Sequence, residues 1–370
     1  MPGVLTADLA DVPGSVWAAA SPAPVYTARA WLAASRWPGD GLRYLLGGGL
    51  MMPARTVTDP AAWSRMNLVD VCAGTAFGDW ADAGAVARAR SEAVPHLLVA
   101  APGYFTVPIG PPDGDVSALV DAVEGQGLVA GFGYLPPEAG SLLRELRRRG
   151  YATGVSSVTT RLDLLGDSFE DYLAGLSGRR RGQVRHEIRC FTRAGGAIDH
   201  ASGRDVVEQL PLIARLENAL QRAHGYAAED ESYLALNARF AELFGPSLHL
   251  LQASLAGEPV ATVTLLQAGD DLVARAFGAA DSPEIRAAAV YFNLVYYASI
   301  ELGLRLGVRR IWFGPSTLEA KRGRGLTLVP LVAAVGPRGG DALRPLLAQT
   351  DARLRAMLTR ERPPPCTSCS

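Results

Sequence analysis

The clearest pattern in the chain is an alternation of apolar and polar positions that begins after its middle. Three successive runs, LHLLQASL from Leu248, VATVTLLQ from Val260 and LVARAFG from Leu272, repeat with a period close to two. The turns AGEP and AGDD separate them. A period of two places one face of a strand against a core, so these runs predict an antiparallel meander.

Helical spacing precedes this meander. The segment FEDYLAGLSGRRRGQVRHEIRCFTRAGG, which begins at Phe169, carries apolar residues three and four apart on both sides of Gly178. This spacing predicts two helices, the second ending at the glycine pair 195–196, and a further helix covers about 206–223.

A long helix and a strand are predicted after the meander. Pro283 opens the helix, which runs to about residue 307, and VRRIWFG (308–314) reads as a strand. A glycine-rich loop that contains Lys321 follows the strand.

The first half of the chain shows a weaker version of the same order. Strand-like runs lie at 95–101 and 127–135, a helix with Pro137 early and Gly150 at its end follows, and 151–164 is rich in β-branched residues.

Antiparallel hairpins, a helix and a returning strand resemble the order of a GNAT-type acyltransferase domain, and two such halves appear here. A chain of 370 residues exceeds one ordinary core, so two domains are expected. The predicted fold is α+β with mixed sheets: GNAT-like domains at 1–157 and 158–355 with a groove between them, and a tail at 356–370.

Composition and charge argue against several classes of protein. Apolar residues make up 48% and the formal net charge is −1, so the whole molecule has no electrostatic pull toward nucleic acid or membrane. The N-terminal residues lack the basic start and apolar run of a signal peptide, and no apolar stretch approaches the roughly 20 residues of a membrane span. We therefore expect a cytoplasmic protein without membrane insertion.

The four cysteines do not suggest a disulfide framework in a chain of this size. Cys366 and Cys369 form a lone CxxC in the tail, without the second pair that a zinc ribbon needs. The five histidines have no metal-ligand spacing, so no metal is expected.

Lys321, in LEAKRGRG, is the only lysine, although Lys and Arg together number 36. A GC-rich coding bias would explain scarce lysine, and one survivor could be chance. The alternative is a role that guanidinium cannot fill, namely a compact, strongly hydrated charge or a titratable amine.

Two segments resemble a known family. YLAGLSGRRRGQVRHEIRCFTRAGG is similar to the opening helices of the second domain of Fem-type aminoacyltransferases and the wider FemAB-like superfamily. YFNLVYYASIELGLRLGVRRIWFGPSTLEAKRGRG is similar to the C-terminal signature of that superfamily. Together they cover about 60 residues.

The resemblance implies transfer of an aminoacyl group from aminoacyl-tRNA to an amine of a small molecule or peptide, in cell-wall precursors or peptide-like natural products. The compositional bias favours a natural-product pathway, such as antibiotic biosynthesis, over a role in wall building. It places Lys321 near the reacting ester as the candidate catalytic residue. Aminolysis of an ester passes through an oxyanion, which a fixed positive charge stabilises, and a lysine can protonate the leaving hydroxyl. No resident cofactor is expected. The alternatives are an acyl-CoA-dependent N-acyltransferase and a non-catalytic binding protein on the same scaffold.

Basic residues near the start of the second predicted helix are candidates for tRNA or phosphate binding, with a solvated helix face as the other interpretation. They are Arg179, Arg180, Arg181 and Arg185. The short match RAFGAA to a coenzyme A phosphate loop is weak, because Arg275 falls within a predicted strand.

Five further residues are candidates for substrate binding. Arg322 and Arg324 flank the lysine and suit a phosphate or carboxylate, while Glu319 either pairs with Lys321 or positions the acceptor amine. Tyr296 and Tyr297 lie on the long predicted helix, where one hydroxyl is expected to reach the cleft and the other ring to be core.

Overall fold

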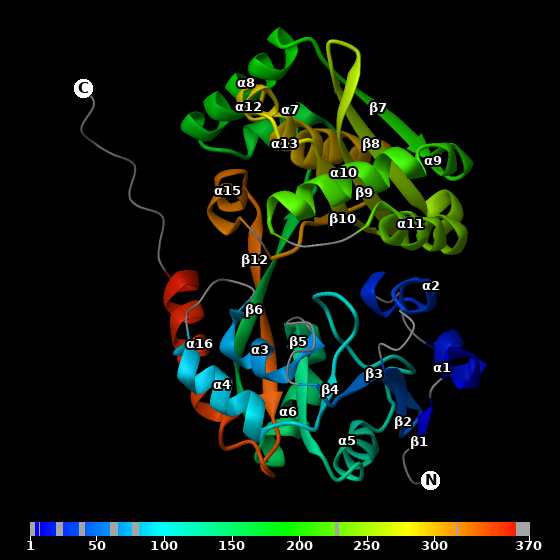
Figure 1. Cartoon of the computed structure of the whole chain (residues 1–370), viewed down its shortest axis with the longest axis vertical. Helices are drawn as coiled ribbons and strands as arrows, with labels where there is room; N and C mark the ends of the chain where they lie inside the picture. The colour runs from blue at the N-terminus through cyan, green and yellow to red at the C-terminus, as the bar shows by residue number, and fades with distance from the viewer. Residues whose placement is uncertain are drawn as a thin grey trace. The chain divides into compact units, whose positions relative to one another are not determined.

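The computed structural model describes residues 4–6, 8–19, 25–36, 41–59, 66–75, 81–225, 229–315 and 317–359 (Figure 1). The chain forms two compact units. Unit 1 consists of Met1–Ser21, Pro38–Thr159 and Leu328–Ser370, and unit 2 consists of Pro22–Trp37 and Thr160–Thr327. The last strand and helix of the chain thus belong to unit 1.

Unit 1 is built on a sheet with the strand order β1-β2-β3-β4-β5-β12-β6. The strand β4 runs parallel to β5, whereas β5 and β12 are antiparallel. The strands are β1 (Val4–Thr6), β2 (Leu42–Gly47), β3 (Leu50–Val57), β4 (His96–Val99), β5 (Val129–Leu135), β12 (Thr327–Val335) and β6 (Ala152–Asp163), the last of which continues into unit 2.

Helices cover this sheet and complete its apolar core. Phe132 of β5 and Leu142 and Leu146 of α6 belong to one buried cluster, each with no exposed surface. The helices of unit 1 are α1 (Gly14–Ala19), α3 (Leu68–Ala73), α4 (Ala83–Glu92), α5 (Val116–Glu124), α6 (Gly140–Arg148) and α16 (Leu343–Thr359).

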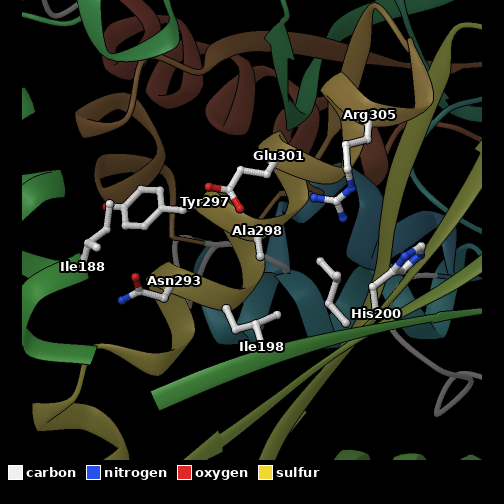
Figure 2. Close-up of a pocket in the computed structure, with 9 residues that line it drawn as sticks. Ile188, Ile198, His200, Asn293, Tyr297, Ala298, Glu301 and Arg305 are labelled. Carbon is white, nitrogen blue, oxygen red and sulfur yellow. The ribbon is translucent and has the colours of Figure 1, made fainter. Parts of the chain in front are cut away.

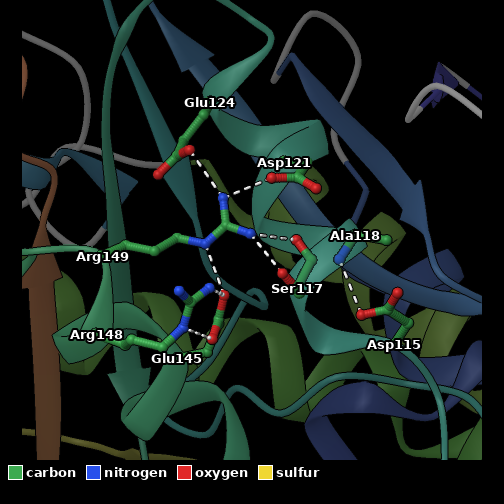
Figure 3. Close-up of polar contacts among 8 residues, drawn as sticks. All are labelled: Asp115, Ser117, Ala118, Asp121, Glu124, Glu145, Arg148 and Arg149. Atoms are coloured by element: carbon green, nitrogen blue, oxygen red, sulfur yellow. Dashed lines mark hydrogen bonds and ion pairs between the residues drawn. The ribbon is translucent and has the colours of Figure 1, made fainter.

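The arginine run at the end of α6 has a structural role in unit 1. The guanidinium of Arg149 donates to Asp121 at 2.6 Å, to Glu124 at 2.9 Å and to Glu145 at 2.7 Å, and it also bonds Ser117 (Figure 3). One cation thus joins α5 to the end of α6. Basic residues at a helix C-terminus also complement the helix dipole.

Unit 2 is built on a second run of strands in the order β6-β11-β10-β9-β8-β7. The strands β7 to β10 pair with their neighbours in antiparallel fashion, and β11 joins β10 in parallel. The bounds are β7 (Gly196–Ser202), β8 (Leu248–Leu255), β9 (Glu258–Ala268), β10 (Asp271–Ala279) and β11 (Arg310–Trp312). The predicted meander corresponds to β8, β9 and β10.

Val184, Leu294 and Phe313 belong to one apolar cluster of unit 2. The predicted helices around Gly178 are α7 and α8, and α8 ends before the glycine pair as expected. The helices are α2 (Arg29–Ala34), α7 (Phe169–Ala174), α8 (Gly178–Arg193), α9 (Arg204–Glu208), α10 (Leu210–Ala223), α11 (Asp230–Phe244), α12 (Pro283–Ala287), α13 (Val290–Phe292), η7 (Asn293–Ala298), α14 (Ser299–Leu306) and α15 (Leu318–Gly323).

The prediction of one long helix from Pro283 to about 307 was wrong. Ala289 adopts a left-handed conformation with φ of 55°, so the helix that begins at Pro283 cannot continue through it. The side-chain amide of Asn293 donates to the carbonyl oxygen of Ala289. After the short helix α13, the six residues of η7 form a π-helix in which every residue is buried. A helix buried on all sides lacks the polar face that periodicity detects, so the sequence did not reveal this change.

The described part of the chain has no helix both long and apolar enough to cross a membrane. Within the same residues no group of three or more potential ligands among His, Cys, Asp and Glu could hold a metal ion. Helix α16 runs to Thr359, and Cys366 and Cys369 lie outside the described residues.

Candidate functional site

The segment after β11 carries Lys321 in a short helix, not in the open glycine loop that the sequence predicted. Phe313 and Gly314 follow the strand, Gly314 with φ of 59°, and Thr317 precedes α15 with φ of 54°. Thr160 of β6 fixes this turn, because its hydroxyl donates to the carbonyl of Gly314 at 2.9 Å and its own carbonyl accepts from the N–H of Phe313 at 2.9 Å.

The ammonium group of Lys321 lies inside unit 2. The residue is 1% exposed, and Nζ donates to the carbonyl oxygen of Gly314 at 2.9 Å and to that of Phe313. Burial lowers the pKa of this amine from 10.5 to about 7, since a low-dielectric environment disfavours the charged form. The predicted partner Glu319 does not bind it: its side chain is 85% exposed and pairs with Arg322 at 3.5 Å.

Arg324 forms a buried ion pair that the sequence did not indicate. Its guanidinium donates to both carboxylate oxygens of Glu187, at 2.6 and 2.7 Å, although Arg324 is only 3% exposed. Another of its nitrogens donates to the carbonyl of Ala320 at 2.8 Å. This geometry holds the end of α15 against α8, so Arg324 is placed to support the turn with Lys321.

Aromatic rings enclose this ion pair. The guanidinium of Arg324 lies 3.7 Å from the ring centroid of Phe292 and 5.4 Å from that of Tyr296, within the range of cation–π attraction. The hydroxyl of Tyr297 donates to Glu187 and accepts from Nε of Arg324 at 3.2 Å. Burial and the bond to Glu187 raise the pKa of Tyr297 well above its usual range.

Both candidate tyrosines are buried, at 0% exposure for Tyr296 and 3% for Tyr297, so both rings and not one belong to the core. The hydroxyl of Tyr296 lies 3.1 Å from that of Tyr291, which lies 3.4 Å from the hydroxyl of Thr317. Tyr296 thus reaches the turn before α15 through a second tyrosine. Tyr297 lines a small pocket on its other side, and Lys321 does not.

Two polar residues of this cluster, Glu187 and Asn293, were missed by sequence reasoning. Asn293 donates to the backbone oxygen of Glu187 at 3.1 Å, and Gln183 donates to its carboxylate at 3.1 Å. The available signal was a glutamate inside an arginine-rich helix and an asparagine inside an apolar one. Buried polar groups require partners of this kind.

The structure distinguishes the members of the predicted basic cluster on α8. Arg181 donates to the carbonyls of Ala174 and Leu176, at 3.2 and 2.8 Å, and so completes the end of α7. Arg185 pairs with Glu170 at 3.4 Å, and both side chains are more than half exposed. Arg179 is exposed and Arg180 half-buried.

The side chain of Arg275, which is 6% exposed, belongs to β10, at the position where the register with β9 shifts between Ala274 and Ala276. It donates to Asn237 at 2.7 Å and lies 3.5 Å from Glu217. The sequence RAFGAA therefore belongs to a strand and not to a loop that opens a helix, as expected from its position.

Comparison with known proteins gives one family match and several shared folds. Residues 165–335 match the FemAB-like family, described as peptidoglycan biosynthesis and recognition. No curated protein matches the sequence.

Three solved structures share the fold. FemX is 11% identical with a TM-score of 0.54, over 90% of this chain and 97% of FemX. A conserved protein of unknown function from Bacteroides thetaiotaomicron is 12% identical with a TM-score of 0.56, over 89% and 97%. The C-terminal domain of a putative lysylphosphatidylglycerol synthetase from Agrobacterium fabrum is 14% identical with a TM-score of 0.52, over 85% and 89%.

These matches confirm the predicted α+β, GNAT-like fold. The matched residues contain α8, the π-helix η7 and the turn that carries Lys321. Over residues 165–335 this chain is therefore similar to the FemAB-like family, the Fem-type group that its sequence resembles.

Proposed function

We propose that this protein transfers an aminoacyl group from aminoacyl-tRNA to the amine of a small molecule or peptide in a natural-product pathway. The observation that carries the proposal is Lys321, a single lysine buried within the FemAB-like segment, with a pKa near 7. FemX, whose fold this chain shares, supports the class of reaction. The donor implies a cytoplasmic reaction, because aminoacyl-tRNA is made there.

The chemistry needs little apparatus beyond a positioned cation. The acceptor amine attacks the ester carbon, a C–N bond forms, and the C–O bond to the 3′-oxygen of the tRNA breaks. Negative charge develops first on the carbonyl oxygen and then on the leaving oxygen. An ammonium ion has three donors, and the carbonyls of Phe313 and Gly314 accept two of them. In the proposal the third meets the developing oxyanion.

A pKa near 7 suits the second half of this reaction. The ammonium can donate a proton to the leaving 3′-oxygen, and the resulting neutral amine can take up the proton that the acceptor nitrogen must lose after it has attacked and become positively charged. Arginine could not exchange protons in this way, since its pKa is too high. The ion pair of Arg324 and Glu187 holds α15, so we assign Arg324 a positioning role.

The remaining predicted residues have roles at the periphery in this proposal. Arg179 and Arg185 extend an exposed cationic face of α8 that suits the phosphates of tRNA. Arg322 and Glu319 lie next to Lys321 in α15 and are the candidates for contact with the acceptor. Arg181 is occupied by the end of α7 and contributes to that face mainly through its charge.

Replacement of the lysine tests the proposal directly. Lys321→Met and Lys321→Arg are both expected to lower kcat about 10²- to 10³-fold, as the loss of an oxyanion donor does. The substrates are bulk tRNA charged with a mixture of radiolabelled amino acids and a pool of short peptides. Arg286→Met, an exposed substitution, is the control and should retain full activity. A folded Lys321→Met variant with unchanged turnover would remove Lys321 from the mechanism.

The donor is tested separately. Ribonuclease treatment of the charged tRNA should abolish transfer, and acetyl-CoA should release no thiol in the presence of the protein. If thiol is released and ribonuclease has no effect, the protein is an acyl-CoA-dependent N-acyltransferase. If neither donor supports transfer while the protein stays folded, a binding protein on this scaffold is the better interpretation.

A further inference from the structure

Unit 2 contains a small pocket that none of the transfer chemistry uses. It lies between α8, the strands β7 and β8, and the continuous segment of η7 and α14 (Figure 2). Its volume is about 170 Å³. A water molecule occupies about 30 Å³ in the liquid and drug-sized ligands need pockets of roughly 300 Å³ or more. The pocket therefore suits a molecule of about the size of one amino acid, and it is too small for coenzyme A.

The inner wall of the pocket is apolar. Leu251 is 1% exposed and Ala298 is 7% exposed, and the side chains of Ile188 and Ile198 complete this wall from α8 and β7. Burial of an aliphatic group here would remove its surface, and that of the wall, from water, which is favourable by about 25 cal/mol per Å².

Opposite charges stand at the mouth of the pocket. Glu301 and Arg305 are one turn apart on α14, a spacing at which a glutamate and an arginine commonly pair. Here they form no ion pair with one another: the carboxylate of Glu301 lies on the side of Tyr297, and the guanidinium of Arg305 lies on the other side of Ala298 (Figure 2).

The cationic end of the mouth is well defined. Burial and the nearby charge of Arg305 lower the pKa of His200, so its ring is neutral near pH 7. One ring nitrogen of His200 lies 3.2 Å from a ring nitrogen of His249, which in turn lies 3.3 Å from the amide oxygen of Gln267. These two contacts fix the orientation of the His200 imidazole, and Arg305 is then the positive charge at that end of the mouth.

We propose that this pocket binds a free α-amino acid with an aliphatic side chain. The ammonium of the ligand lies against Glu301, its carboxylate accepts hydrogen bonds from Arg305, and its side chain lies on Leu251, Ile188 and Ile198. The side chain of Asn293 donates to the backbone oxygens of Glu187 and Ala289, so its amide oxygen is the part that can accept from the ligand. Binding here does not depend on the proposed transfer reaction, and either can fail without the other.

Isothermal titration calorimetry of the full-length protein with L-leucine tests this proposal. Leucinamide lacks the carboxylate, 4-methylpentanoate lacks the ammonium and glycine lacks the side chain, so each is expected to bind at least tenfold more weakly than L-leucine. No heat with L-leucine, or equal affinity for leucine and either single-charge analogue, would overturn the proposal.

Variants locate the binding site. Arg305→Gln and Glu301→Gln should each weaken L-leucine binding at least tenfold, and Ile198→Trp should abolish it by filling the pocket. Arg309→Gln, which changes a residue 80% exposed beyond the same helix, is the matched control and should bind like the unmodified protein. If the charge variants fold and bind L-leucine with unchanged affinity, the ligand binds elsewhere and the assignment of this pocket is wrong.

Discussion

Removal of Arg324 is expected to destabilise unit 2 strongly. In Arg324→Met the carboxylate of Glu187 stays in a site where its side chain is 9% exposed, and it loses two charge-assisted hydrogen bonds of 2.6 and 2.7 Å. It keeps only the bonds from Tyr297 and Gln183. Leaving one member of a buried pair uncompensated costs about 3–5 kcal/mol.

A double-mutant cycle separates the pair from the rest of the packing. Glu187→Gln alone leaves the guanidinium buried without its carboxylate, whereas Arg324→Met with Glu187→Gln removes both charges together. We expect the double variant to lose less stability than the sum of the single variants, by about 2 kcal/mol or more. Arg310→Met is the matched control. It breaks the ion pair with Asp271, in which the arginine side chain is 43% exposed, and it should cost about 1 kcal/mol or less.

Urea unfolding followed by circular dichroism gives the free energies, and hydrogen exchange of peptides from α8 and η7 shows whether the loss is local to the ion pair. Additive single effects, within about 0.5 kcal/mol, would refute the reasoning. An Arg324→Met variant no less stable than the Arg310→Met control would refute it as well.

Three further predictions concern titration, tRNA binding and packing. Because burial lowers the pKa of Lys321 from 10.5 to about 7, the unfolded chain binds a proton between those values that the folded chain does not. The unfolding free energy of the protein should therefore rise relative to that of Lys321→Met by about 1.4 kcal/mol per pH unit above pH 7. Urea unfolding of both proteins at pH 7, 8 and 9 measures this change. A difference in unfolding free energy that stays constant over the three pH values contradicts it. Arg179→Gln and Arg185→Gln should each reduce the slope of log affinity for tRNA against log salt by about 1 in filter binding, and unchanged slopes would exclude this face of α8 from phosphate contact. Gly278→Ala should cost about 1–3 kcal/mol in urea unfolding, because an added Cβ would lie 2.4 Å from the backbone nitrogen of Glu217. Gly182→Ala, on the exposed side of α8 with no atom within 4 Å of the added Cβ, should gain about 0.5–1 kcal/mol, and equal effects of the two would contradict the packing at Gly278.

The sequence predicted best the elements that carry a local signal. The meander β8, β9 and β10 was found from its period of two and its turns, although consecutive residues of β8 and β9 are buried on both faces, and α8 ends where glycines interrupt the helix. The strand β6 was also predicted, from its β-branched residues.

The elements that the sequence did not predict are held by partners distant in the chain. The break at Ala289 and the π-helix η7 lie beside a tertiary contact, the hydrogen bond from the side chain of Asn293 to the backbone oxygen of Glu187. In the same way, the sequence indicated Lys321 as the catalytic candidate and Arg324 as a substrate-binding candidate, but not the groups that hold either side chain. The carboxylate that binds Arg324 is 137 residues away, and the groups that hold Lys321 are backbone carbonyls, which no side-chain motif records.

The order of the strands in unit 1 has a consequence for synthesis on the ribosome. The strand β12 lies between β5 and β6 in the sheet, yet it is translated after all of unit 2. The nascent chain must therefore carry β5 and β6 without the strand that joins them while residues 160–327 emerge and can fold. Until β12 arrives, both of those strands expose unsatisfied edges, so a translation product that stops before residue 328 would be prone to aggregate.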